Sequence, residues 1–101
     1  MTTYSRQACP LCSTPAEYCL VDAENRKYFH CPRCTYFQIS TRAERVLAGL
    51  TQARRDFYAA QAPTAPDNHL FVILIPDRQF RERSDDVLQA SYLPKSSLPL
   101  N

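Results

Sequence analysis

Apolar and polar residues in the first forty positions follow the pattern of short β-strands. Residues 16–21 (AEYCLV) and 27–30 (KYFH) flank a polar segment at 22–26, an arrangement typical of a β-hairpin. Residues 36–39 (YFQI) predict a third strand. The region up to residue 40 is therefore expected to form a three-stranded antiparallel β unit.

The pattern changes to a helical period after residue 40. Thr41 and Glu44 have the spacing of a capping box, so we expect a helix to begin at Thr41. Apolar residues then recur at the spacing of one buried helix face: Ala43, Val46, Leu47, Leu50, Ala53 and Phe57. Gly49 lies within this pattern and costs about 1 kcal/mol relative to alanine. The segment therefore fits either one amphipathic helix to about residue 61 or two helices joined near Gly49.

The last third of the chain predicts one buried strand and a short helix. Residues 69–75 are a continuous apolar run that Pro76 ends. Ser84 is a candidate cap for a helix to about Tyr92, with Asp85 and Asp86 favourably placed in its first turn. Residues 94–101 have no apolar periodicity and predict a flexible tail.

These elements together predict one α+β domain at residues 1–93. Its first part, residues 1–40, carries the β unit and all of the cysteines. Its second part, residues 41–93, is a helix–strand–helix extension.

Composition indicates an ordinary small globular domain whose fold is stabilised by something in addition to its hydrophobic core. The chain has 101 residues, of which 45% are hydrophobic and 22% charged, with five cysteines and one glycine. A chain this short buries a limited core, so the cysteines suggest a stabilising metal. The net charge of +2 does not by itself indicate a nucleic-acid or membrane-surface binder. The longest apolar run is too short to span a membrane and no signal peptide is evident, so we expect a cytoplasmic protein.

The cysteine spacing is the strongest chemical signal. Cys9, Cys12, Cys31 and Cys34 form two C-x₂-C pairs separated by eighteen residues, a spacing typical of a four-thiolate zinc site. Four thiolates close the coordination sphere, which predicts one structural zinc ion worth about 10–16 kcal/mol of apparent folding free energy. The same ligands also suit iron of the rubredoxin type, and a single CPLC suits a redox pair. Two pairs together favour a metal site.

The remaining candidate residues do not form a catalytic constellation. Cys19 lies within a predicted strand and is interpreted as a small buried residue. His30 adjoins Cys31 and is expected to be exposed or to support the metal site, while His69 is expected to be structural. No nucleophile, base and carboxylate are combined in a known catalytic pattern, so we do not expect an enzyme.

Residues 9–41 resemble a zinc ribbon, with CPLC, a hairpin ending in YFHCPRC, and TYFQIS leading into AERVL. The fuller pattern resembles small bacterial zinc-ribbon proteins of poorly defined function. This resemblance implies two metal-binding knuckles, a structural zinc and contact with nucleic acid or protein. Ribbons commonly have glycine after the second cysteine of each knuckle, whereas this chain has Ser13 and Thr35. Each knuckle is therefore expected to accommodate a side chain at that position.

Basic and aromatic residues around the second cysteine pair predict a binding face. Guanidinium groups neutralise phosphates, and exposed aromatic rings stack on unpaired bases. The candidate residues for contact with nucleic acid or a nucleic-acid-associated complex are Arg26, Lys27, Tyr28, Arg33, Tyr36, Arg42 and Arg45. The alternative is a protein–protein interaction adaptor or small accessory inhibitor in which zinc is purely structural. The apolar run at 70–75 also allows a weak homodimer.

Overall fold

The computed structural model describes residues 4–75 and 88–98 and has an α+β fold. A six-stranded mixed sheet has its strands in chain order, β1-β2-β3-β4-β5-β6. Neighbouring strands are antiparallel except β4 and β5, which are parallel. The strands are β1 (Ser5–Ala8), β2 (Pro15–Val21), β3 (Arg26–Cys31), β4 (Thr35–Ser40), β5 (His69–Leu74) and β6 (Gln89–Pro94).

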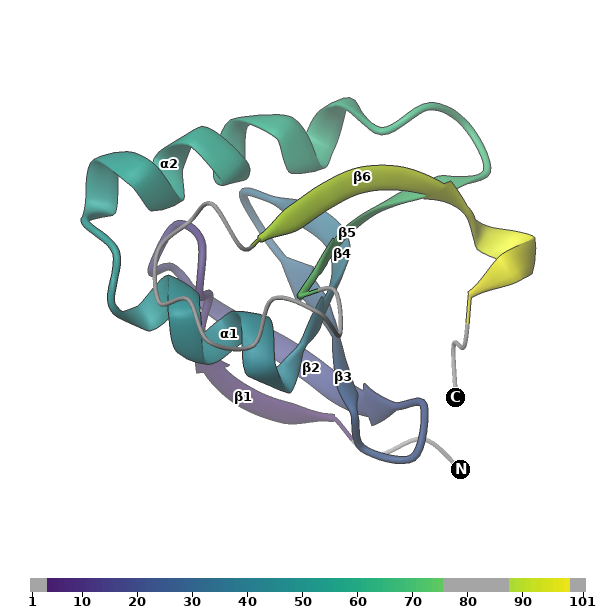
Figure 1. Ribbon diagram of the computed structural model, residues 1–101, viewed down its shortest axis with the longest axis horizontal. Coiled ribbons are helices and arrows are strands. Elements are labelled where there is room, and N and C mark those ends of the chain that lie inside the picture. The colour runs from purple at the N-terminus through teal and green to yellow at the C-terminus, as the bar shows by residue number, and fades with distance from the viewer. Residues whose placement is uncertain (1–3, 76–87, 99–101) are drawn as a thin grey trace.

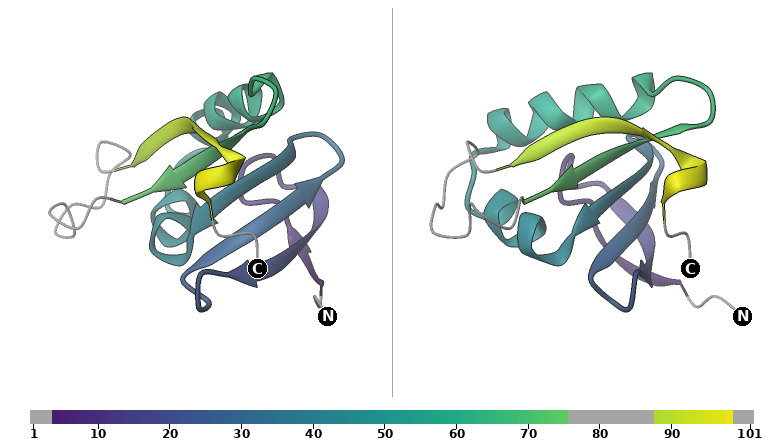
Figure 2. Two further views of the ribbon diagram at one scale, coloured as in Figure 1. Left: turned by 90° about the vertical axis from the view of Figure 1, so that its right-hand side faces the viewer. Right: turned by 45° about the vertical axis from the view of Figure 1, so that its right-hand side comes forward.

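The two helices form the connection between the parallel strands. Parallel neighbours cannot be joined by a tight turn, so the chain between β4 and β5 crosses over the sheet. The crossover consists of α1 (Thr41–Ala48), α2 (Gln52–Gln61) and the 3₁₀ helix η1 (Ala62–Thr64). Both α-helices lie on one side of the sheet (Figures 1 and 2), and we call the opposite side the outer face.

A row of aromatic side chains crosses the sheet beneath the helices. Tyr18, Phe29, Phe37, Phe71 and Tyr92 are successive cross-strand neighbours on β2 to β6. Ring centroids are 5.3 Å apart for Tyr18 and Phe29, 5.1 Å for Phe29 and Phe37, and 5.7 Å for Phe71 and Tyr92. Phe29, Phe37 and Phe71 are fully buried. The predicted ribbon and its extension therefore share one sheet and one core.

The first helix begins at Thr41, as predicted, but Thr41 is not its N-cap. Ser40 is the N-cap, and its Oγ accepts a hydrogen bond from the Ala43 N–H at 3.0 Å. The Thr41 N–H instead donates to the Asn25 carbonyl at 3.0 Å. Glu44 forms an ion pair with Lys27, with Oε1 and Nζ 2.9 Å apart. The predicted capping box is wrong because this tertiary ion pair engages Glu44.

The helical segment is divided in two near Gly49, one of the two possibilities that its pattern allowed. Gly49 ends α1, and Thr51 begins α2 by accepting a hydrogen bond from the Arg54 N–H. The interruption changes which side of α2 faces the core. Tyr58 is consequently buried, whereas Phe57, predicted to be buried, is 66% exposed. The exposure of Ala53 is a second departure from the predicted buried face.

Residues 89–94 are extended, so the helix predicted to reach Tyr92 is wrong over residues 89–92. These residues belong to β6, which pairs along the length of β5 from His69↔Pro94 to Leu74↔Gln89. Leu88 and Ala90 pack partly against the core at alternate positions, as strand geometry requires. Ser84, Asp85 and Asp86 lie outside the described residues. Lys95–Ser97 form the 3₁₀ helix η4.

Strand β1 was not predicted. Its sequence, SRQA, has no apolar alternation, and three of its four residues are exposed. Its extended conformation is held by antiparallel pairing with β2, in register from Ser5↔Tyr18 to Ala8↔Pro15. Backbone hydrogen bonding from a neighbouring strand thus defines this element where side-chain burial does not.

Candidate metal centre

The four predicted ligands converge at one end of the sheet. The Sγ atoms of Cys9, Cys12, Cys31 and Cys34 all lie within 4.8 Å of one another. Sγ of Cys9 is 3.9 Å from that of Cys34, and Sγ of Cys12 is 3.4 Å from that of Cys31. A tetrahedral ion with metal–sulfur bonds of about 2.3 Å requires sulfur–sulfur separations of about 3.8 Å. The cluster is therefore positioned to hold one metal ion.

Two chain segments supply the ligands from neighbouring strand connections. The first CPxC segment (residues 9–12) joins β1 to β2, and the second CPxC segment (residues 31–34) joins β3 to β4. The β2–β3 hairpin sets the register Glu17↔His30, which places the two connections at the same end of the sheet. The two cysteine pairs therefore lie side by side, although eighteen residues separate them in the sequence.

Each CPxC segment is followed by a residue in the left-handed backbone region. Ser13 has φ of 66° and Thr35 has φ of 63°. These are the positions at which the resemblance to zinc ribbons would place glycine, because a residue without Cβ adopts this conformation without strain. The chain thus makes the same turn twice with side chains that disfavour it. This agrees with the expectation that each knuckle accommodates a side chain in place of glycine.

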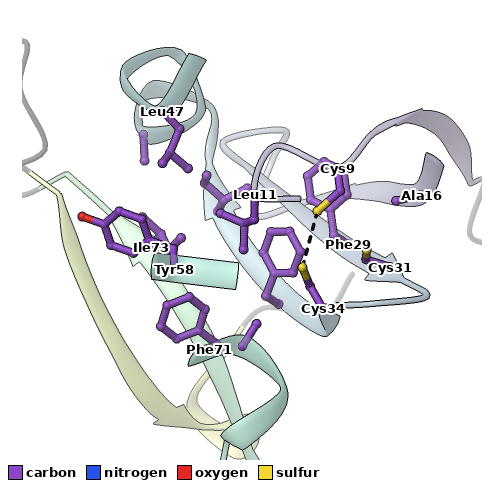
Figure 3. Close-up of a cluster of buried hydrophobic side chains, with 14 residues drawn as sticks. Cys9, Leu11, Ala16, Phe29, Cys31, Cys34, Leu47, Tyr58, Phe71 and Ile73 are labelled. Atoms are coloured by element: carbon purple, nitrogen blue, oxygen red, sulfur yellow. Dashed lines mark hydrogen bonds between the residues drawn. The ribbon is translucent and has the colours of Figure 1, made fainter. Parts of the chain in front are cut away.

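Three of the four cysteines belong to the hydrophobic core. Cys9, Cys31 and Cys34 are no more than 2% exposed and belong to the same buried cluster as Phe29, while Cys12 is half-buried. Figure 3 shows the sulfurs of Cys9 and Cys34 facing each other within this cluster. A metal ion at this point would join both CPxC segments to the core.

The metal-free thiols are unequal in acidity. The side-chain hydrogen bond with Cys34, helped by backbone N–H groups, lowers the pKa of Cys9 to about 5 despite the cost of burial. The same hydrogen bond, together with burial, raises the pKa of Cys34. Burial also raises the pKa of Cys31, although the Arg33 N–H donates to its Sγ at 3.4 Å. Binding of a metal ion by four thiolates would therefore release protons from the site.

Helix α2 contacts the first CPxC segment through Gln52. The Gln52 Nε2 donates to the Leu11 carbonyl at 3.0 Å, and its Oε1 accepts from the Ser13 hydroxyl at 3.0 Å. These bonds span the half-buried ligand Cys12, and Nε2 also donates to Asp56 Oδ1 at 2.8 Å. The sequence did not indicate a role for Gln52 at this site, because Gln52 is forty residues away from Cys12 and no local pattern links the two.

Cys19 and the two histidines lie outside the metal cluster. Cys19 is 3% exposed, as predicted, and burial raises the pKa of its thiol. His30 is exposed and stacks on Tyr36, while Nδ1 of the half-buried His69 lies 2.9 Å from the Asp67 carbonyl oxygen. Neither histidine belongs to the cluster of possible metal ligands in the described part of the chain.

The predicted binding residues do not share one surface. Arg26 and Tyr28 are on the outer face with Tyr36, whereas Lys27, between them on β3, faces the helices. Strand alternation causes this separation, since successive side chains point to opposite faces. Lys27 is neutralised by Glu44.

The predicted arginines also differ in their surroundings. Arg26 lies 3.6 Å from Asp22 and donates to Gln38, so its charge is partly satisfied. Arg33 is exposed in the second CPxC segment, and Arg42 and Arg45 are exposed on α1. Of the predicted basic residues on β3, Arg26 therefore lies on the same face as Tyr28 and Tyr36, whereas Lys27 does not.

No family model, no curated protein and no solved structure matches this chain. Within residues 4–75 and 88–98, neither α-helix has the length and apolar character needed to cross a membrane.

Proposed function

We propose that this protein is a non-catalytic binding module stabilised by a structural zinc ion. The observation that carries the proposal is the convergence of four sulfur atoms at near-tetrahedral spacing. When bound, zinc would supply cross-linking between the two CPxC segments. Because Cys9, Cys12, Cys31 and Cys34 fill all positions of a tetrahedral ion, no position is left for an activated water.

We further propose that the module contacts nucleic acid. Support comes from exposed arginines near the second CPxC segment and on α1, together with tyrosines on the outer face. Guanidinium groups suit phosphates, and exposed rings suit unpaired bases. The alternative occupant is a protein, for which tyrosine and arginine are also favoured contact residues.

The first test is metal analysis of the purified protein combined with nucleic-acid binding in a salt series. We expect one zinc per chain, and affinity for labelled oligonucleotides that falls as salt rises, because counterions are released from phosphates. A metal-free folded protein would refute the structural role of zinc. Absence of binding to any DNA or RNA at low salt would refute nucleic-acid contact and redirect the search to a protein partner by affinity capture.

A further inference from the structure

Four side chains form a row across the outer face beside the metal centre. Arg6 on β1, Glu17 on β2, His30 on β3 and Tyr36 on β4 are successive cross-strand neighbours. Directly paired residues in a sheet project from the same face, so the row is continuous. All four residues are exposed.

The row ends in an exposed pair of stacked rings. His30 and Tyr36 have ring centroids 4.5 Å apart with planes inclined by 9°, and Tyr36 is 46% exposed. Tyr28, the diagonal neighbour, has its ring centroid 5.9 Å from that of Tyr36. Because both residues are exposed, the face of the pair is open to a ligand. The pair is a preformed aromatic platform.

Two open hollows adjoin this platform. One, of about 570 Å³, is lined by Arg6, Ala8, Pro15, Glu17, His30 and Pro32, among others. The second, of about 130 Å³, is lined by Tyr4, Tyr28 and Tyr36 and shares Glu17 and His30 with the first. The larger one is within the size range of small-molecule sites, about 300–1,000 Å³, and a nucleotide is of this scale.

We propose that this row binds an unpaired base of single-stranded nucleic acid, an inference that rests on the proposed nucleic-acid function. The base stacks on the His30–Tyr36 pair, and Arg6 contacts an adjacent phosphate. Stacking on an aromatic ring accepts any base because every base has a π-face. A base within a duplex is already stacked on both sides, so the platform selects unpaired strands.

Charge along the row favours base contact over a continuous phosphate track. Arg6 is paired in register with Glu17, so the cation is followed by an anion. Glu17 repels phosphates near the platform, which limits the row to about one phosphate contact. Single strands contribute a log–log salt slope of about 0.7 per phosphate neutralised. We therefore expect replacement of Arg6 by glutamine to reduce the slope by about 0.7.

The decisive experiment compares variants of Tyr36 in the zinc-loaded protein. The probe is a fluorescein-labelled oligonucleotide of about 12 nucleotides, as a single strand and as a duplex. Tyr36→Leu removes the π-system but keeps an apolar side chain, and Tyr36→Phe keeps the ring. Phe57→Ala is the matched control, because it removes an exposed aromatic ring from α2 on the other side of the sheet. Zinc content and thermal unfolding establish that each variant is folded.

The expected result is a single-strand affinity about 5- to 140-fold weaker for Tyr36→Leu, the equivalent of one lost stacking contact. Tyr36→Phe and Phe57→Ala should bind like the wild type, and the duplex should bind more weakly than the single strand. Equal binding by Tyr36→Leu and the wild type would overturn this site while leaving nucleic-acid binding intact. Equal binding of duplex and single strand would overturn the selectivity. Failure of the wild type to bind either probe would overturn the proposed nucleic-acid function together with this site.

Discussion

Replacing Thr35 by glycine should stabilise the protein, whereas the same replacement at Ser13 should leave stability nearly unchanged. Both residues follow the second cysteine of a CPxC segment, and both have left-handed backbones, with φ of 63° and 66°. Their side chains differ in what they contact. Ser13 donates to Gln52 Oε1 at 3.0 Å, whereas no hydrogen bond of the Thr35 side chain occurs among the described residues.

The expected magnitude follows from three opposing contributions. A left-handed backbone costs a non-glycine residue about 1–2 kcal/mol. Glycine restores this amount but loses about 0.5–1 kcal/mol through the greater freedom of the unfolded chain. Thr35→Gly should therefore raise the free energy of unfolding by about 0.5–1 kcal/mol, or Tm by about 2–8 °C. At Ser13 the lost hydrogen bond, worth about 0.5–1.5 kcal/mol, offsets this gain.

The assay is thermal unfolding of the zinc-loaded protein at a fixed free zinc concentration, because metal bound to the folded chain adds to apparent stability. Thr35→Ala is the control, since it removes the branched side chain but retains the Cβ that disfavours this backbone. It should gain less than Thr35→Gly. A lower Tm for Thr35→Gly, or an equal gain for Ser13→Gly, would refute the reasoning.

Three further predictions concern the metal and the core. Cys34→Ser should abolish stoichiometric zinc binding and the near-ultraviolet circular dichroism signal. Cys19→Ala should retain one zinc per chain, because Cys19 lies outside the cluster. Loss of zinc from Cys19→Ala would contradict the proposed ligand set. Phe37→Ala should lower the unfolding free energy by about 3–5 kcal/mol in urea titrations, because Phe37 is fully buried; a cost below about 1 kcal/mol would contradict its central position in the core. A double-mutant cycle with Lys27→Met and Glu44→Gln should give a coupling energy of about 1 kcal/mol in the free energy of unfolding, because this ion pair is partly buried. Additive effects of the two substitutions would show that the ion pair contributes no coupling energy.

The strands β2, β3 and β4, which adjoin the four-cysteine cluster, were predictable from local pattern. Residues 16–21, 27–30 and 36–39 each combine strand-forming residues with turn residues on at least one side, and the observed β2, β3 and β4 extend these segments by one or two residues. The apolar run at 69–75 likewise corresponds to β5 (His69–Leu74), buried from Leu70 to Ile73. In these segments the choice of apolar or polar residue at each position reflects whether that side chain is buried, so the strands can be recognised from the sequence.

The elements that were missed depend on pairing with another segment of the chain. Strand β1 is polar and exists through pairing with β2, and β6 is extended through pairing with β5. The helix cap moved to Ser40 because Thr41 bonds Asn25 and Glu44 bonds Lys27, residues on or before β3. Each of these interactions joins two different segments of the chain, and the side-chain pattern within one segment carries no information on such pairs.

The sequence by itself determined which four cysteines lie in position to hold a metal ion, and the small α+β character of the chain. The C-x₂-C spacing is a local geometric constraint, since two residues between cysteines let both sulfurs of a tight turn reach one ion. Only the tertiary structure decided which polar and aromatic residues meet. Alternation along β3 separates Lys27 from Tyr28, while cross-strand register joins Arg6, Glu17, His30 and Tyr36 into one row. Register is set by the pairing of whole strands, so a surface assembled across strands emerges only when the sheet is formed.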